Sequence, residues 1–148
     1  MSTFLAIKED VVEALKAHNE VKVSTLRFLI SKLENAKIQK GQELTDEELL
    51  AEVAKDVKRH RESAVAFRSA GREELAKKEE EELAFLTKYL PQQISEQEVE
   101  KAVDAVIAET GATAISDMGR VMSAVMAKVG QSADGSVVSN LVRAKLSK

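Results

Sequence analysis

The chain has 148 residues, of which 44% are apolar and 32% are charged, enough for one or two small domains with packed cores. It contains no cysteine, which excludes disulfides and thiolate metal sites. One proline and six glycines among many good helix formers favour helix along nearly the whole length. No apolar run approaches the ~20 residues that span a bilayer. Because charge also comes early in the first ten residues, we expect a cytoplasmic protein that does not contact membranes.

The net charge of −3 is unevenly spread along the chain. Residues 112–148 contain five basic and two acidic residues, a net charge of +3, so residues 1–111 sum to −6. A basic tail after an acidic body favours an anionic partner for the tail.

Four helices are predicted before the single proline. Apolar residues at helical spacing predict helices over about 3–17 and 21–40. A third begins at the capping box Thr45-Asp46-Glu47-Glu48 and ends near Gly71. A fourth helix follows on a stripe of leucines at positions 75, 83, 86 and 90. Helices of this length with short connections pack as antiparallel neighbours.

The clearest boundary is at Pro91, which cannot continue a helix and pushes the preceding residue out of the helical region. A second capping box, Ser95 to Glu98, starts a new helix soon afterwards. Two more short helices follow, the last with Asp134 as its N-cap. We therefore predict an all-α protein: an antiparallel helical bundle over 1–91, then a small three-helix domain over 94–148.

The residues give little support for catalysis. Of two histidines, His60 follows Asp56 by four residues, and we interpret it as a helix-boundary histidine beside a carboxylate. A catalytic triad on a single helix is improbable. The run Lys77–Glu82 is interpreted as a solvated face with i,i+4 pairs such as Lys78 with Glu82. We expect no catalytic residue, no metal, no cofactor and no small-molecule substrate.

Two groups of basic residues are candidates for binding RNA. In the tail the cations surround the turn formed by Asp134 and Gly135, and they are Arg120, Lys128, Arg143 and Lys145. A secondary patch lies on the third predicted helix: Lys55, Lys58 and Arg59. The region after Pro91 has no aromatic residue, so RNA binding there is expected to use phosphates, with strong salt dependence.

Several motifs occur in a specific order. The tail contains Asp117-Met118-Gly119-Arg120-Val121-Met122, then Met126-Ala127-Lys128, then Ala133-Asp134-Gly135. Tyr89-Leu90-Pro91-Gln92-Gln93 precedes them. In order and spacing these motifs resemble the GatB/YqeY family, and the chain is similar to its free-standing YqeY-like members. The resemblance implies a helical fold related to tRNA-dependent amidotransferases, which are carbon–nitrogen ligases with glutamine as amido-nitrogen donor.

The resemblance implies tRNA as a partner, with an amidotransferase or an aminoacyl-tRNA synthetase as possible protein partners. Arg120 stands where the family has lysine, and Lys128 matches a family lysine. Gly130-Gln131-Ser132 replaces a segment that is basic in relatives, and Ala127 replaces a proline. These departures should weaken phosphate contact beside the turn.

Three functions are considered. The leading hypothesis is a non-catalytic module that binds tRNA or associates with an amidotransferase. The alternative is a helical adaptor that binds a protein and no RNA. Independent glutamine-dependent ligation has no support in the residues, because neither a glutaminase nucleophile nor an ATP site is visible.

Overall fold

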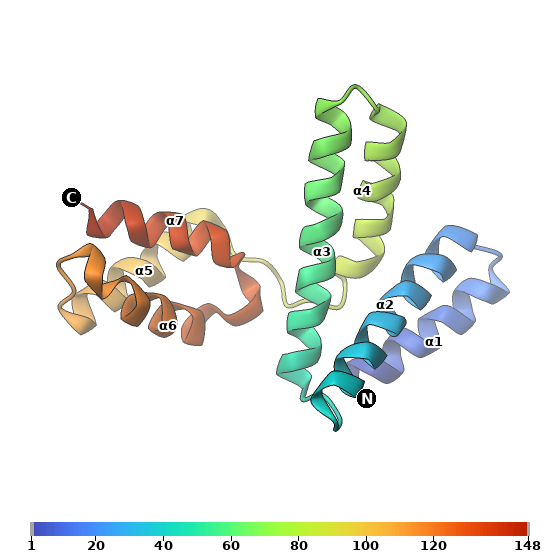
Figure 1. The fold of residues 1–148 in the computed structure, drawn as a ribbon, viewed down its shortest axis with the longest axis horizontal. Helices are drawn as coiled ribbons and strands as arrows, with labels where there is room; N and C mark the ends of the chain where they lie inside the picture. The colour runs from blue at the N-terminus through green and yellow to red at the C-terminus, as the bar shows by residue number, and fades with distance from the viewer. Residues whose placement is uncertain (1, 148) are drawn as a thin grey trace. The chain divides into compact units, whose positions relative to one another are not determined.

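The computed structural model describes residues 2–147, and it confirms the all-α prediction (Figure 1). These residues form seven α-helices and two short 3₁₀ helices, with no strand among them. The chain divides into two compact units, residues 1–90 and 91–148. None of the described helices is both long and apolar enough to cross a membrane.

The first unit consists of two helical hairpins (Figure 1). Helix α1 packs on α2, and α3 packs on α4, while α2 also contacts both later helices. The four helices span Thr3–Lys16, Glu20–Lys40, Asp46–Ser69 and Glu73–Thr87. Gly41 ends α2 with φ of 79°, a left-handed conformation that glycine adopts without steric cost.

The core of the first unit is built from the predicted apolar stripes. Every helix contributes at least one large side chain that is fully or almost fully buried, among them Ile7, Leu26, Leu29, Val53 and Leu86. Burying such a side chain stabilises the fold by about 1.5–3 kcal/mol, so these contacts hold the two hairpins together.

The second unit is a three-helix domain with a valine-rich core. Its helices are α5 (Glu96–Thr110), α6 (Met118–Val129) and α7 (Gly135–Leu146), and 3₁₀ turns precede and follow α6. The most deeply buried side chains are Val99, Val103, Val106, Val121, Val125, Val138 and Val142. The three methionines at positions 118, 122 and 126 pack against this cluster, as expected for core residues.

Two details of the second unit differ from the sequence expectation. Ser95 caps α5 by accepting from the Glu98 N–H at 3.2 Å, but the reciprocal half of the predicted capping box is absent within residues 2–147. Gly130–Ser132, for which no helix was predicted, forms a 3₁₀ turn. Its carbonyls accept from the Ile94 N–H at 2.9 Å and, at Gln131, from the Gln93 side chain at 2.8 Å. This turn therefore anchors the segment that enters α5.

Candidate functional site

The structure places three of the four tail cations in ion pairs. Arg120 Nη2 lies 3.1 Å from Asp117 Oδ1, and Lys128 Nζ lies 3.0 Å from Glu109 Oε1. Lys145 Nζ contacts carboxylates of α5 at 2.8 and 3.2 Å, those of Glu100 and Asp104. An anionic ligand would have to compete with these carboxylates.

The remaining tail candidates have two different roles. Arg143 is exposed on α7 and has no ion pair among the described residues. Asp134 is the N-cap of α7, because its Oδ1 accepts from the Ser136 N–H at 2.8 Å, and Gly135 is the first residue of that helix. The Asp134–Gly135 turn thus starts a helix, and the carboxylate occupies the place where a phosphate would bind.

The tail is basic as a stretch of sequence, but the folded unit that contains it is not basic. Helix α5 brings five acidic residues against the basic tail. Residues 91–148 together contain six basic and seven acidic residues, a net charge of −1. Because acidic α5 packs on both α6 and α7, the tail cations are largely neutralised.

The secondary patch on α3 opens onto a groove between α2 and α3. The groove has a volume of about 410 Å³, and Lys55 and Arg59 line it together with Lys32 of α2. The carboxylates of Glu52 and Asp56 also line it. The ring of Phe28, which is 52% exposed, lies outside the groove lining but contacts two of its cations. Lys32 Nζ and Arg59 Cζ lie 4.9 and 5.3 Å from the ring centroid. We call the three cations and this ring the α2–α3 basic groove.

Lys58 lies outside this groove. It is exposed on α3 and makes no ion pair within the described part of the chain. Lys55 is 73% exposed in its side chain, and its one ion pair with a described residue is with Glu52, at 3.2 Å. Exposed pairs of this kind contribute about 0–1 kcal/mol, so Lys55 exchanges this partner easily.

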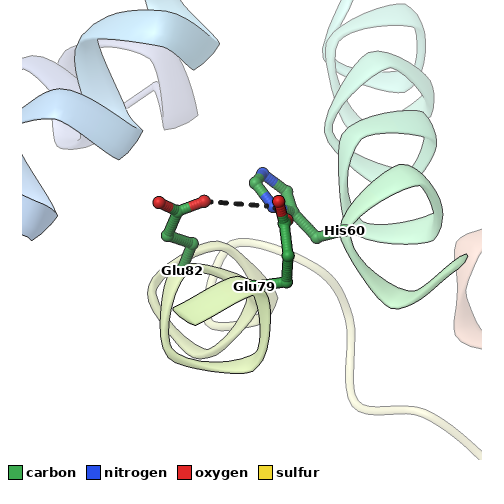
Figure 2. A group of neighbouring side chains, drawn as sticks. All are labelled: His60, Glu79 and Glu82. Atoms are coloured by element: carbon green, nitrogen blue, oxygen red, sulfur yellow. Dashed lines mark hydrogen bonds and ion pairs between the residues drawn. The ribbon is translucent and has the colours of Figure 1, made fainter. Parts of the chain in front are cut away.

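The interpretation of His60 as a helix-boundary residue was wrong. His60 lies in the interior of α3, is 4% exposed, and faces α4 as well as its own helix. Its Nδ1 lies 2.5 Å from Glu79 Oε2 and 3.4 Å from Glu82 Oε2. Figure 2 shows the three side chains converging, one from α3 and two from α4.

The neighbouring Asp56 is almost completely buried, with an exposed fraction of 1%. Its Oδ1 accepts from Lys32 Nζ at 2.8 Å and from the Arg59 guanidinium at 3.0 and 3.1 Å. Its Oδ2 lies 3.7 Å from His60 Nε2 and has no hydrogen-bond partner among residues 2–147. A buried carboxylate oxygen without a partner is uncommon in folded proteins and needs a physical reason.

Sequence reasoning missed Glu79 and Glu82 as site residues. Both lie in the acidic run that we interpreted as a solvated face, yet their side chains are only 19% and 17% exposed. The pair Lys78–Glu82 does not form within residues 2–147. The i,i+3 spacing of the two glutamates was a signal, because it places both on one helical face. Their pairing with His60, 19 residues away, depends on the register of the α3–α4 hairpin.

A second hollow adjoins the cluster of His60, Glu79 and Glu82. It has a volume of about 250 Å³ and is lined by Ser24, Thr25 and Phe28 of α2, together with Arg59 and the three clustered side chains. The cluster is therefore open to solvent on one side.

An apolar groove lies at the turn between α1 and α2. It has a volume of about 580 Å³, and Leu15, Val23 and Phe28 line it. Leu15 is 46% exposed, so this groove presents apolar surface to solvent.

The family model described as "Yqey-like protein" matches residues 5–146. The chain belongs to the YqeY-like family. The match includes all residues of the α2–α3 basic groove, the cluster at His60 and the tail cations.

Three relatives of this YqeY-like chain illustrate the family. One is an uncharacterized protein of Schizosaccharomyces pombe, 29% identical over 89 residues, or 60% of the chain and 72% of the relative. Two are named altered inheritance of mitochondria protein 41, mitochondrial. That of Pyrenophora tritici-repentis is 28% identical over 142 residues, 93% of the chain and 77% of the relative. That of Vanderwaltozyma polyspora is 29% identical over 122 residues, 77% of the chain and 65% of the relative.

Proposed function

We propose that this YqeY-like protein is a non-catalytic module that binds tRNA, in association with an amidotransferase or an aminoacyl-tRNA synthetase. The observation that carries the proposal is the α2–α3 basic groove. There an exposed aromatic ring and three cations adjoin one another, which is the combination that binds single-stranded nucleic acid. The family resemblance supports the same class of partner.

The groove is a better candidate than the tail because an exposed aromatic ring adjoins its cations, whereas the region after Pro91 has no aromatic residue. Lys55 has one weak exposed partner, and the Lys32 and Arg59 head groups contact the Phe28 ring while sharing one carboxylate. In the tail, by contrast, Lys145 is held by two carboxylates. The tail residue best placed to add a phosphate contact is Arg143, which is exposed and unpaired among the described residues.

Binding of bulk tRNA to the intact protein tests the proposal. We expect the double variant Phe28→Ala, Lys55→Ala to weaken binding about 10- to 100-fold at low salt, because a base stacked on an aromatic ring contributes about 1–3 kcal/mol. Lys55→Ala alone should reduce the slope of log affinity against log salt by about 1.

The control, Lys77→Ala with Lys78→Ala, removes two positive charges, one more than the groove variant does. These lysines are exposed on α4, and removing them lowers the net charge without touching the groove. Equal losses in both double variants, or no tRNA binding by the intact protein, would contradict the proposal.

A second candidate function, a helical protein-binding adaptor, is favoured by the apolar groove at the α1–α2 turn. Partially exposed apolar side chains that line a hollow are typical of sites for partner helices. A protein partner recovered with the intact chain should then survive ribonuclease treatment and be lost in Leu15→Glu. Loss of the partner on ribonuclease treatment would favour tRNA binding instead.

A further inference from the structure

We propose that His60, Glu79 and Glu82 form a binding site for a divalent transition-metal ion, with Zn²⁺ as the ion that best suits the donors. Imidazole nitrogen and carboxylate oxygen are both ligands that zinc accepts in proteins. The three ligands are not residues of the α2–α3 basic groove, although Arg59 and Phe28 adjoin both sites, and the site does not depend on the tRNA proposal.

The geometry is close to that of a metal centre. One donor atom from each of the three residues lies within 4.8 Å of the other two, and the residues come from two helices packed side by side (Figure 2). Donors about 2.0–2.2 Å from a tetrahedral zinc ion lie about 3.4 Å apart. The two glutamate side chains would therefore have to move by about 1 Å, which their rotatable bonds allow.

The electrostatics also favour a cation. The nearby cations, Lys32 and Arg59, are both bonded to Asp56. Glu79 and Glu82 are mostly buried and have the His60 imidazole as their only ionisable partner among the described residues. Two carboxylates that share a single imidazole at low exposure repel each other, and a divalent ion between them would remove this repulsion.

Asp56 supplies the second observation. In metal centres a ligating histidine donates its other ring N–H to a carboxylate, which fixes the tautomer and ring orientation. The unpartnered Asp56 Oδ2, buried and 3.7 Å from His60 Nε2, is placed for that role. The Arg59 Nη2 group now lies 3.2 Å from the same nitrogen and would turn toward the Asp56 carboxylate.

Metal binding at His60 Nδ1 would displace the proton that this nitrogen shares with Glu79. In the contact of 2.5 Å between His60 Nδ1 and Glu79 Oε2 a proton lies between nitrogen and oxygen. While Nε2 accepts from Arg59, the single ring proton is on Nδ1; a metal ion at Nδ1 would move that proton through solvent to Nε2, which then donates it toward Asp56, and no net proton is released. The hollow of about 250 Å³ above the cluster leaves room for a fourth, solvent ligand.

The test uses the untagged full chain, stripped of metal with a chelator. We expect one Zn²⁺ to bind per chain by calorimetry, and one Co²⁺ to give the visible absorption bands of a four-coordinate site. Because the ion joins α3 to α4, the unfolding temperature should rise by about 10 °C at a free zinc concentration near 100 times Kd. Addition of the chelator should reverse the shift.

Glu82→Gln is the main variant, and Glu81→Gln is its matched control. Glu81 is the adjacent residue of α4 and is exposed, so both changes remove one negative charge from the same helix. Glu82→Gln should lower zinc affinity at least ~100-fold, whereas Glu81→Gln should leave it unchanged. Retained affinity in Glu82→Gln, or no Co²⁺ absorption with the wild-type chain, would overturn the proposal.

Asp56→Asn tests the positioning role. It should weaken zinc binding about 10- to 100-fold while the Co²⁺ spectrum keeps its four-coordinate form, because the three ligands remain. Zinc that binds equally to His60→Gln but is lost in His18→Gln would place the ion at the exposed histidine and overturn the assignment. Circular dichroism of each variant without metal shows whether the helices are intact.

Discussion

Tyr89, the single tyrosine of the chain, joins the end of the first unit to α1. Its hydroxyl donates to the carboxylate of Asp10, which also accepts from Lys88 Nζ at 2.8 Å. Burial, and then the hydrogen bond to the Asp10 carboxylate, raises the pKa of the Tyr89 hydroxyl above its ordinary value. Deprotonation would place two negative charges in contact, so the fold favours the neutral phenol.

This arrangement predicts a loss of stability at alkaline pH. A pKa that is higher in the folded chain than in the unfolded chain gives a stabilisation that is complete below about pH 10 and is lost as pH rises further. With one tyrosine and no tryptophan, the ultraviolet absorbance of tyrosinate reports Tyr89 alone. We expect titration well above pH ~10 in the native chain and a lower value in Asp10→Asn. Titration near pH 10 in both proteins would contradict the contact.

Of the residues at the His60 cluster, the sequence predicted the neighbourhood of Asp56 and His60 but not the two glutamates. The pair His60 and Asp56 was found because both lie on one helix at i,i+4 spacing. The two glutamates were assigned to solvent because a run of charges favours an exposed face in most helices. Their burial follows from the packing of α4 on α3, a tertiary contact that no local pattern in the sequence specifies.

At the scale of elements, the start of α3 was predicted from the capping box of Thr45 and Glu48, and the structure confirms this box. Thr45 Oγ1 accepts from the Glu48 N–H at 3.1 Å, and the Glu48 carboxylate accepts from the Thr45 N–H at 2.9 Å. The same carboxylate is held by Lys40 at the end of α2. Both backbone donors are satisfied locally, which is why a four-residue motif sufficed to locate this helix start. The 3₁₀ turn of Gly130–Ser132 had no such signal, because its partners are 38 residues away.

The capping box should contribute measurably to stability. Thr45→Ala should destabilise the first unit by about 1 kcal/mol, since the N–H of Glu48 loses its acceptor. Thr45→Ser keeps the hydroxyl and is the control, with an expected change within about 0.5 kcal/mol. Urea denaturation followed by circular dichroism measures both. Equal destabilisation by alanine and serine would show that the methyl group, not the hydroxyl, stabilises the helix start.

At the scale of the whole molecule, the position of charges in the fold differs from their order in the sequence. The tail is basic as a segment, but α5 supplies the carboxylates that pair with Lys128 and Lys145. A count along the sequence therefore overstated the positive charge available to an anionic partner. The groove between α2 and α3 gathers cations from segments that the sequence separates by more than 20 residues, which local spacing does not reveal.

Helix α5 should consequently act as an internal competitor of RNA for the tail cations. Glu100→Gln with Glu109→Gln releases Lys128 fully and leaves Lys145 with Asp104 alone. If the tail contributes to tRNA binding, this variant should bind more tightly at low salt, and the salt dependence should steepen by about 1, because each new phosphate contact adds about 0.7–0.9 to the slope.

The control is Glu96→Gln with Glu98→Gln, which changes the net charge equally in the same helix but at exposed side chains that pair with none of the described tail cations. A larger gain in affinity for the first pair than for the second would assign the effect to the released lysines. Equal gains would mean that only the net charge matters, and tRNA contact would then be confined to the first unit, where Lys55 and Phe28 lie.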